Sequence, residues 1–326
     1  MSIGKNLQKL EIEDLKFITE NFDIKEHQYD KNFYENIEAA YLKNIQRLYS
    51  FLPVKTYEFL KEFFIGDKIT FSGHDSYNCV YTFEKFGLCS FEDEIHIFKD
   101  NGKNKNYFPD LNFSINKKLY EFLDKNFELV LDEYKLRDAI SGILHTYLFL
   151  SLDDLLKIIN DLGFCQNEQS LQHFLKYKVN PFAYYEKTNS MGQKIIVEGS
   201  YYILSETLDE IENYKGDRTI HTLETYLNLA FHFNKPEEFL DLDNHLIKNN
   251  SNYTTNIFLF SDIEESLINN LDYAECLKRI ENQFNILDSK NPIIVDSIVK
   301  EKIASLYNRF PIASLGGTIN PNRVRL

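Results

Sequence analysis

The sequence predicts a mainly α-helical protein with minor β-structure, made of helical units and one winged-helix-like module with a β-hairpin. Three observations lead to this prediction. Apolar residues recur at helical spacing through most of the chain, in short segments that have recognisable starts and stops. Two extended runs in the middle of the chain are joined by good turn chemistry. Three helical segments precede these runs, and this is the element order of a winged helix.

Composition and charge set the broad class of the protein. The 326 residues are 43% hydrophobic and 15% aromatic, which is enough for a packed core and excludes wholesale disorder. The 36 basic and 50 acidic residues give a net charge of -14. The chain has no long uncharged apolar run, and its start reaches Glu11 before a signal-peptide core could form. We therefore expect a cytoplasmic protein without membrane contact. The bias toward Asn and Lys indicates a bacterial genome.

The first third of the chain combines helical stripes with one strand. Apolar spacing predicts three helices, over 15–22, 37–52 and 57–64. Pro53 ends the second of these helices. The other expected elements are a helix, a strand, a loop and a turn, over 77–86, 94–98, 70–75 and 99–106.

The middle of the chain carries the clearest signals. Three helices are expected, over 136–147, 152–162 and 167–175. Ser151 is placed to cap the second helix, with Asp154 as a carboxylate in its first turn, and Gly163 ends it. The third helix ends before Pro181. The hairpin strands and their turn are expected over 182–187, 194–203 and 189–192.

The last third of the chain is predicted to be almost entirely helical. Four segments are expected to begin helices: Thr219, Pro236, the capping box Ser261–Glu264, and Asn291–Pro292. After Pro311 the chain ends in a tail that contains arginines and no acidic residues. We expect this tail to be frayed or packed on the surface, because chain ends are usually poorly ordered. The predicted organisation has four parts, with boundaries at 1–38, 39–128, 129–216 and 217–326.

No motif predicts catalysis, a cofactor or a metal site. The chain lacks phosphate-loop, dinucleotide-binding, nucleophile-elbow and zinc-protease motifs, and no C-x-x-C pair is present. We expect the four cysteines to be buried free thiols. His221 with Glu224, and the dipeptide His74-Asp75, are the best remaining polar pairs. We interpret the first as a polar helix face and the second as turn chemistry.

The third helix and the hairpin of the winged-helix-like unit form the candidate interaction or nucleic-acid surface. Its residues are Gln169, His173, Lys176, Lys178, Tyr184, Tyr185, Lys187 and Lys194. Charge disfavours DNA, because residues 129–216 contain eight basic and thirteen acidic residues and therefore carry a net charge of 8 − 13 = -5. Exposed tyrosines suit a protein interface better, since they offer contact area at low entropy cost.

Three segments carry a resemblance to uncharacterised bacterial cytoplasmic proteins built of helical and winged-helix-like units. They are 136–164, the hairpin region 178–204, and the end of the chain over 306–322. The tail departs from the commoner Gly-x-Thr-Pro-Asn order, because Ile319 and Asn320 lie between Thr318 and Pro321. The resemblance implies no activity and no catalytic residues.

These observations favour a non-enzymatic interaction or regulatory protein whose partner is another protein. Two alternatives stay open. A winged-helix DNA-binding regulator would need a lysine face on the third helix and wing, and its binding would fall steeply with salt. An enzyme would need polar side chains from separate segments to converge in one pocket.

Overall fold

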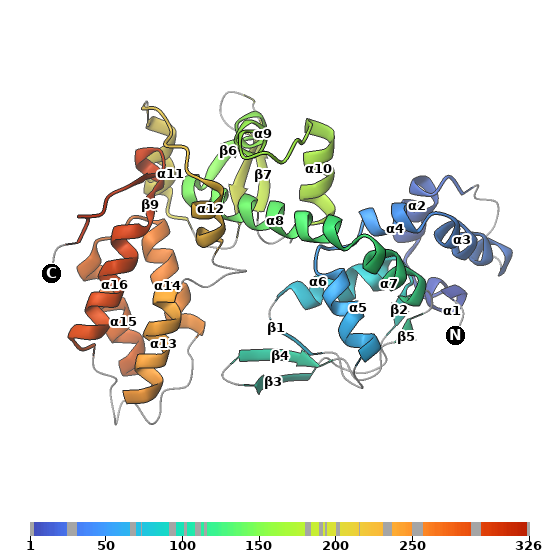
Figure 1. Cartoon of the computed structure of the whole chain (residues 1–326), viewed down its shortest axis with the longest axis horizontal. Coiled ribbons are helices and arrows are strands. Elements are labelled where there is room, and N and C mark those ends of the chain that lie inside the picture. The colour runs from blue at the N-terminus through green and yellow to red at the C-terminus, as the bar shows by residue number, and fades with distance from the viewer. Residues whose placement is uncertain are drawn as a thin grey trace. The chain divides into compact units, whose positions relative to one another are not determined.

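The computed structural model is mainly helical, with short antiparallel strands, over the residues that it describes (Figure 1). These residues are 3–24, 31–65, 70–72, 74–90, 96–100, 103–107, 112–113, 116–179, 184–188, 192, 194–199, 203–214, 216–230, 237–249, 257–287 and 295–324. The chain forms two compact units. The N-terminal unit contains Met1–Tyr134 and Gln172–Pro181, and the C-terminal unit contains Lys135–Leu171 and Phe182–Leu326.

The helices of the N-terminal unit enclose an aromatic-rich core. They are α1 (Ile3–Leu7), α2 (Ile12–Asn21), α3 (Lys31–Lys43), α4 (Ile45–Ser50), α5 (Thr56–Ile65), α6 (His74–Lys85), α7 (Asn116–Lys125) and the start of α8 (Phe127–Tyr147). The predicted apolar stripes supply the core, and Tyr41 packs edge-on against Phe22 with ring centroids 4.9 Å apart. The helix expected over 37–52 is divided, because Asn44 accepts a hydrogen bond from the backbone N–H of Arg47 and so caps a new helix.

Short strands complete the N-terminal unit. Three of them form an antiparallel sheet in the order β1-β4-β3: β1 (Thr70–Ser72), β4 (Lys103–Tyr107) and β3 (His96–Asp100). A second pair joins β2 (Cys89–Ser90) to β5 (Asn112–Phe113). The loop expected over 70–75 is therefore wrong, and so is much of the turn expected over 99–106. Cross-strand pairing gives these polar segments backbone partners that local composition does not reveal.

The middle of the chain alternates helices and strands. After α8 come β6 (Phe149–Ser151), α9 (Leu152–Asp161), α10 (Glu168–Tyr177), β7 (Tyr184–Thr188) and β8 (Lys194–Glu198), and the sheet order is β6-β8-β7. Ser151 caps α9 as predicted, since its hydroxyl accepts from the Asp154 N–H at 3.0 Å. Strand β6 was not predicted from the sequence. It pairs with β8 over only three residues. Residues 189–191 of the predicted turn lie outside the described part.

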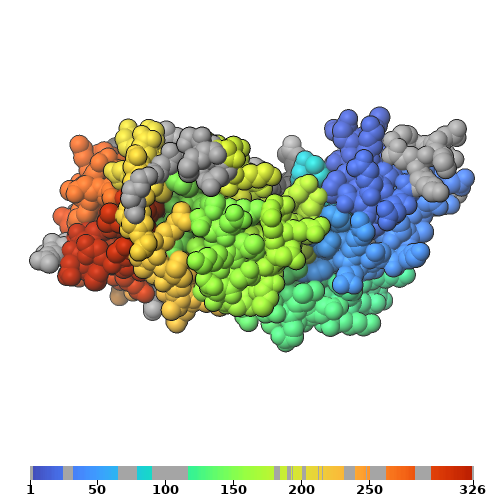
Figure 2. All heavy atoms as spheres, turned by 90° about the horizontal axis from the view of Figure 1, so that it is seen from above, coloured from blue at the N-terminus to red at the C-terminus, as the bar shows by residue number. Residues whose placement is uncertain are grey.

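The rest of the C-terminal unit is helical. Its elements are α11 (Ser205–Asn213), α12 (Leu223–Leu229), α13 (Glu237–Asn249), α14 (Ile257–Ile268), α15 (Tyr273–Leu287) and α16 (Ser297–Arg309). Helices α13–α16 pack together around buried residues such as Leu242, Ile263 and Ile303. Figure 2 shows the red atoms of α16 and the tail lying beside the orange atoms of the other C-terminal helices.

Two of the four helix starts predicted in the last third are wrong, and the other two, Pro236 and Asn291-Pro292, lie outside the described residues. Thr222 caps α12 in place of Thr219. Asp296 caps α16 by accepting a hydrogen bond from the N–H of Val299. The capping box Ser261–Glu264 lies inside α14, because four residues from Ile257 onward are already helical before it. A local cap motif competes with packing of the apolar residues around it, and packing prevails here.

The compact units do not follow the four predicted parts. The boundary expected at 38/39 lies inside α3, and the one at 128/129 lies inside α8. Helix α10 belongs to both units, since Gln172–Pro181 cluster with the N-terminal residues. The physical reason is aromatic packing, because Tyr177 meets Phe51 edge-on with ring centroids 4.8 Å apart.

The C-terminal tail docks on its own unit. It contains β9 (Pro311–Ile312), a 3-10 turn (Ala313–Leu315) and β10 (Thr318–Ile319). The Gly316 carbonyl accepts from the Thr219 N–H at 2.8 Å, and the Gly317 carbonyl lies 2.7 Å from Nε2 of His221. Farther along, the Val324 N–H donates to Oδ1 of Asn308 at 2.7 Å. A frayed terminus is therefore excluded for residues up to Val324.

Candidate functional site

Helix α10 exposes only part of the predicted interaction surface. Gln169 and Lys176, seven residues apart and so on one helix face, are exposed. His173 is half-buried, with Nε2 lying 3.0 Å from the Ser50 carbonyl and its ring 5.4 Å from that of Phe51. Packing within the N-terminal unit therefore uses one side of this helix and leaves the other to solvent.

Lys178 differs most from its predicted position on the surface. It is only 4% exposed, and its Nζ donates to the Tyr49 carbonyl at 2.8 Å, lies 3.4 Å from Oε2 of Glu133 and sits 3.5 Å above the Tyr49 ring. The Tyr49 hydroxyl donates to the same Glu133 oxygen. Burial lowers the pKa of Lys178 to about 8, although the Glu133 carboxylate opposes this shift. This ammonium is a structural group of the N-terminal unit and cannot reach a partner.

The hairpin residues lie on the edge strand β7 and at the start of β8. Tyr185, Lys187 and Lys194 are exposed, whereas Tyr184 is half-buried and burial raises its pKa. Tyr185 and Lys187 lie on one face of the sheet. Their paired residues on β8, Val197 and Ile195, are buried. Of the eight predicted residues, five are thus exposed: Gln169, Lys176, Tyr185, Lys187 and Lys194.

The C-terminal unit contains a buried polar cluster that no local sequence pattern indicates. His145 of α8 is 1% exposed, with Nδ1 lying 2.6 Å from the Leu229 carbonyl and Nε2 3.5 Å from Oε1 of Glu198. Glu264 of α14 is also buried. Burial by itself would lower the pKa of His145, but Glu198, the Leu229 carbonyl and Glu264 outweigh it and raise the pKa. Because both ring nitrogens face acceptors, this geometry favours the protonated form of the imidazole.

The structure places one histidine from each of the polar pairs considered for catalysis. His74 begins α6, so the expected loop around it is absent, and the His221 imidazole is engaged with the tail. Cys79, Cys89 and Cys276 are buried free thiols as predicted, but Cys165 is exposed and has a φ of 49°. Cys165 lies two residues after Gly163, the glycine that ends α9 and has a φ of 96°.

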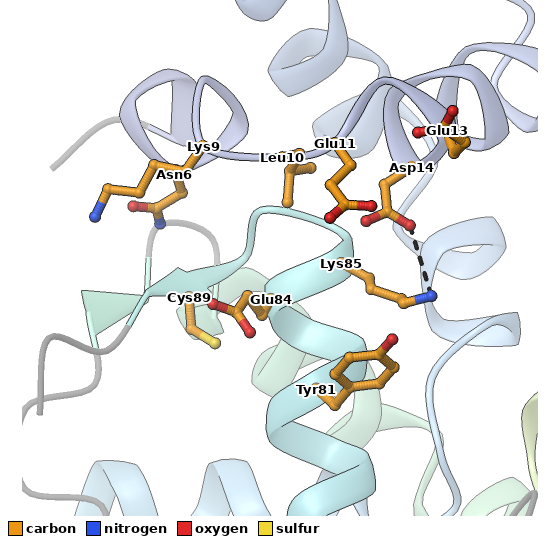
Figure 3. Close-up of a pocket in the computed structure, with 10 residues that line it drawn as sticks. All are labelled: Asn6, Lys9, Leu10, Glu11, Glu13, Asp14, Tyr81, Glu84, Lys85 and Cys89. Carbon is orange, nitrogen blue, oxygen red and sulfur yellow. Dashed lines mark ion pairs between the residues drawn. The ribbon is translucent and has the colours of Figure 1, made fainter. Parts of the chain in front are cut away.

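A cavity of about 350 Å³ lies in the N-terminal unit between the α1–α2 segment and α6 (Figure 3). Its lining residues are Asn6, Lys9, Leu10, Glu11, Glu13, Asp14, Tyr81, Glu84, Lys85 and Cys89. Gly87 brings the two walls together, since it has a φ of 62° and an added Cβ would lie 2.6 Å from a Leu7 methyl carbon. No sequence motif marks this cavity, because its walls come from separate segments.

Charged side chains and one aromatic ring line this cavity. Figure 3 shows Lys85 reaching toward Asp14, with Nζ 3.6 Å from the Asp14 carboxylate, and the same ammonium lies 4.8 Å from the centroid of the Tyr81 ring. Burial alone would lower the pKa of Lys85, but Tyr81 and Asp14 raise it. Cys89 at the base is 1% exposed, and burial raises its pKa far above the usual range, so it remains a neutral thiol.

Among the described residues, no group of His, Cys, Asp and Glu side chains has the geometry of a metal site. No helix in the described part of the chain is long and apolar enough to cross a membrane. Comparison of the chain with protein-family models, with curated proteins and with solved structures found no match.

Proposed function

We propose that the chain is a non-enzymatic interaction or regulatory protein of the bacterial cytoplasm, and that it binds another protein through a winged-helix-like module. The element order supports this module. Helix α8, strand β6, helices α9 and α10, and strands β7 and β8 follow one another, with the sheet order β6-β8-β7. This is the order of a winged helix, in which the short first strand pairs with the last strand of the wing.

The proposal is supported by one observation: side chains at the end of α10 pack inside the N-terminal unit. In a DNA-reading winged helix, the third helix presents basic and polar side chains to the major groove. Here His173, Tyr177 and Lys178 pack against α4 and Glu133 instead. Burial removes one of the two lysines expected to neutralise phosphate on this helix and leaves Lys176. Since phosphate neutralisation supplies most affinity for DNA, a protein partner is favoured.

The test is capture of partners from a bacterial lysate on the immobilised protein, with and without nuclease, at about 50 and 200 mM salt. We expect a defined protein to be retained after nuclease treatment at the higher salt. Retention of nucleic acid that disappears with salt would overturn the proposal in favour of a DNA-binding regulator. An empty column would favour the enzyme alternative.

A pair of matched variants locates the contact. Gln169→Ala with Lys176→Ala removes the exposed polar stripe of α10. Lys43→Ala with Gln46→Ala removes the same two residue types from exposed positions elsewhere. The proposal expects capture to fall for the first variant only. Equal capture by both variants and the wild type would place the contact outside α10, and Tyr185→Ala then tests the wing.

A further inference from the structure

We infer that His145 is a pH-sensitive switch that joins helix α12 and strand β8 to helix α8. This inference goes beyond the proposed function and does not depend on the identity of a partner. His145 lies in the last turn of α8 and is 1% exposed. Its Nδ1 lies 2.6 Å from the carbonyl oxygen of Leu229 in α12, and its Nε2 lies 3.5 Å from Oε1 of Glu198 in β8. One imidazole therefore links three elements that are distant in sequence.

The number of protons on the ring determines how many of these links can form. An imidazolium has an N–H at both ring nitrogens, so it donates to Leu229 and Glu198 at the same time. A neutral imidazole has one N–H, and its other nitrogen presents a lone pair to an acceptor oxygen. Loss of one proton to solvent therefore removes one of the two links and leaves two acceptors facing each other.

Two buried carboxylates favour the protonated ring. Among the described residues, the charged groups that act on His145 are Glu198 from β8 and Glu264 from α14, while α12 contributes the Leu229 carbonyl. Glu198 is 1% and Glu264 is 3% exposed, so solvent screens their attraction for a cation only weakly. Burial alone would lower the pKa of His145, but these groups outweigh it and raise the pKa above its ordinary value of 6.5.

Helix α12 is the element that depends most directly on this proton. It is only seven residues long, so tertiary contacts must stabilise it. Leu229 is its last residue, and carbonyls in the last turn of a helix have no partner within the helix. The imidazolium supplies that partner, and its positive charge suits the C-terminal end of the helix dipole. Deprotonation of His145 therefore weakens the end of α12.

The direction of the pH dependence follows from linkage. The stabilisation by protonated His145 is fully present below pH 6.5, where the ring is protonated in the folded and the unfolded chain alike. It is lost as the pH rises through the higher pKa of the folded protein. We therefore expect α12 to be held firmly at mildly acidic pH and to open more often at alkaline pH.

The test is an NMR titration of the histidine rings of the full-length protein between about pH 5 and 9. We expect the ring of His145, assigned through its contact with Leu229, to titrate above pH 6.5. As the ring loses its proton, the hydrogen-exchange protection of the α12 amides should fall at least about threefold, after correction for the intrinsic pH dependence of exchange. A ring that titrates at or below pH 6.5, or constant protection of α12 through its titration, would overturn the inference.

Glu198→Gln tests whether the carboxylate in β8 holds the proton on His145. The amide keeps the shape of the side chain and removes its charge, so the pKa of His145 should fall by about one unit or more. The loss of α12 protection should move to lower pH by the same amount. Glu186→Gln is the matched control, because Glu186 carries the same charge at an exposed position of β7 in the same sheet. An unchanged pKa in Glu198→Gln, or an equal fall in both variants, would contradict the switch. If Glu198→Gln does not fold, the titration of the wild type decides.

His145→Gln removes the charge at every pH. We expect the protection of α12 in this variant to be low already below pH 6.5 and to stay constant as the pH rises. His245→Gln is the control, since His245 lies 3.0 Å from Oδ2 of Asp296 in the same unit and should leave the response of α12 unchanged. If the protection of α12 in His145→Gln still falls with pH as in the wild type, a different group controls this helix and the inference is wrong.

Discussion

The structure differs most from the sequence-based predictions at buried charged side chains. The sequence predicts Lys178 to be a surface cation, two residues after Lys176. In the folded chain, Tyr49 and Glu133 surround its ammonium within the N-terminal unit. A long basic side chain is normally solvated, and only paired groups compensate its burial. These partners are distant in sequence, so no local pattern predicts the burial.

Lys178 predicts a pH dependence of stability. Its pKa is about 8 in the folded protein against 10.5 for the free side chain. Between these values the unfolded chain binds more protons, so this group makes the free energy of unfolding rise with pH. We expect the wild type to gain on the order of 2 kcal/mol relative to Lys178→Met between about pH 7.5 and 9.5. Urea unfolding of both proteins at the two pH values measures this difference.

The prediction is tested by whether the stability difference between the wild type and Lys178→Met changes with pH. If Lys178 kept its ordinary pKa, the two unfolding curves would move in parallel with pH. A parallel shift would therefore contradict the burial of its ammonium. Tyr49 still donates to Glu133 in the variant, which limits the direct cost of removing the lysine. Carbon-13 NMR of the lysine side chains gives the pKa itself.

At the scale of elements, one glycine determines how closely α8 and α12 approach. Gly142 lies inside α8, where a glycine normally weakens a helix by about 1 kcal/mol relative to alanine. A Cβ at this position would lie 1.8 Å from the Tyr226 carbonyl oxygen. Tyr226 is fully buried, and its hydroxyl lies 2.8 Å from that of Tyr147. The close approach of the backbones therefore requires the absence of a side chain.

Helix propensity alone predicts that Gly142→Ala stabilises the protein, but we expect the substitution to destabilise it. The added methyl group must push α12 away from α8, and overpacking of this kind costs about 1–3 kcal/mol. We therefore expect a net loss of stability, measured by urea unfolding followed by circular dichroism. A variant as stable as the wild type, or more stable, would show that α12 does not pack against this position.

At the scale of the whole molecule, the tail closes the C-terminal unit. Ile312 and Ala313 are buried, and the tail bonds to residues from two earlier segments: Thr219 and His221 in the loop before α12, and Asn308 in α16. Arg323 stacks over the Tyr307 ring, with its guanidinium carbon 4.7 Å from the ring centroid. Arg323, which has no acidic neighbours in the sequence, thus stacks on an aromatic ring.

Deletion of residues 312–326 should lower the melting temperature by at least about 5 °C, since several hydrogen bonds and buried side chains are lost together. Thermal unfolding followed by circular dichroism measures the change. Asn308→Ala, which removes only the two bonds to Val324, should cause a smaller decrease. A truncated protein with an unchanged melting temperature would show that the tail contributes nothing to stability and is free for a partner.

Local signals predicted most helices and missed features that depend on distant partners. Ser151 and Gly163 bound α9 as their chemistry predicts. Thr219, by contrast, has the right residue type for a helix cap but binds the tail at Gly316. The capping box at Ser261 failed because α14 begins earlier. A cap motif identifies a side chain able to bond to a backbone N–H, but tertiary packing selects which backbone N–H it meets.

By itself, the sequence determined the mainly helical class and the helices and hairpin strands in the middle of the chain, although not strand β6. These features depend on periodicity and local chemistry, which act over a few residues. Only the tertiary structure decided the burial of Lys178, the cluster around His145 and the cavity lined by Glu11 and Glu84. Each of these joins segments far apart in the chain, and long-range packing determines which segments meet.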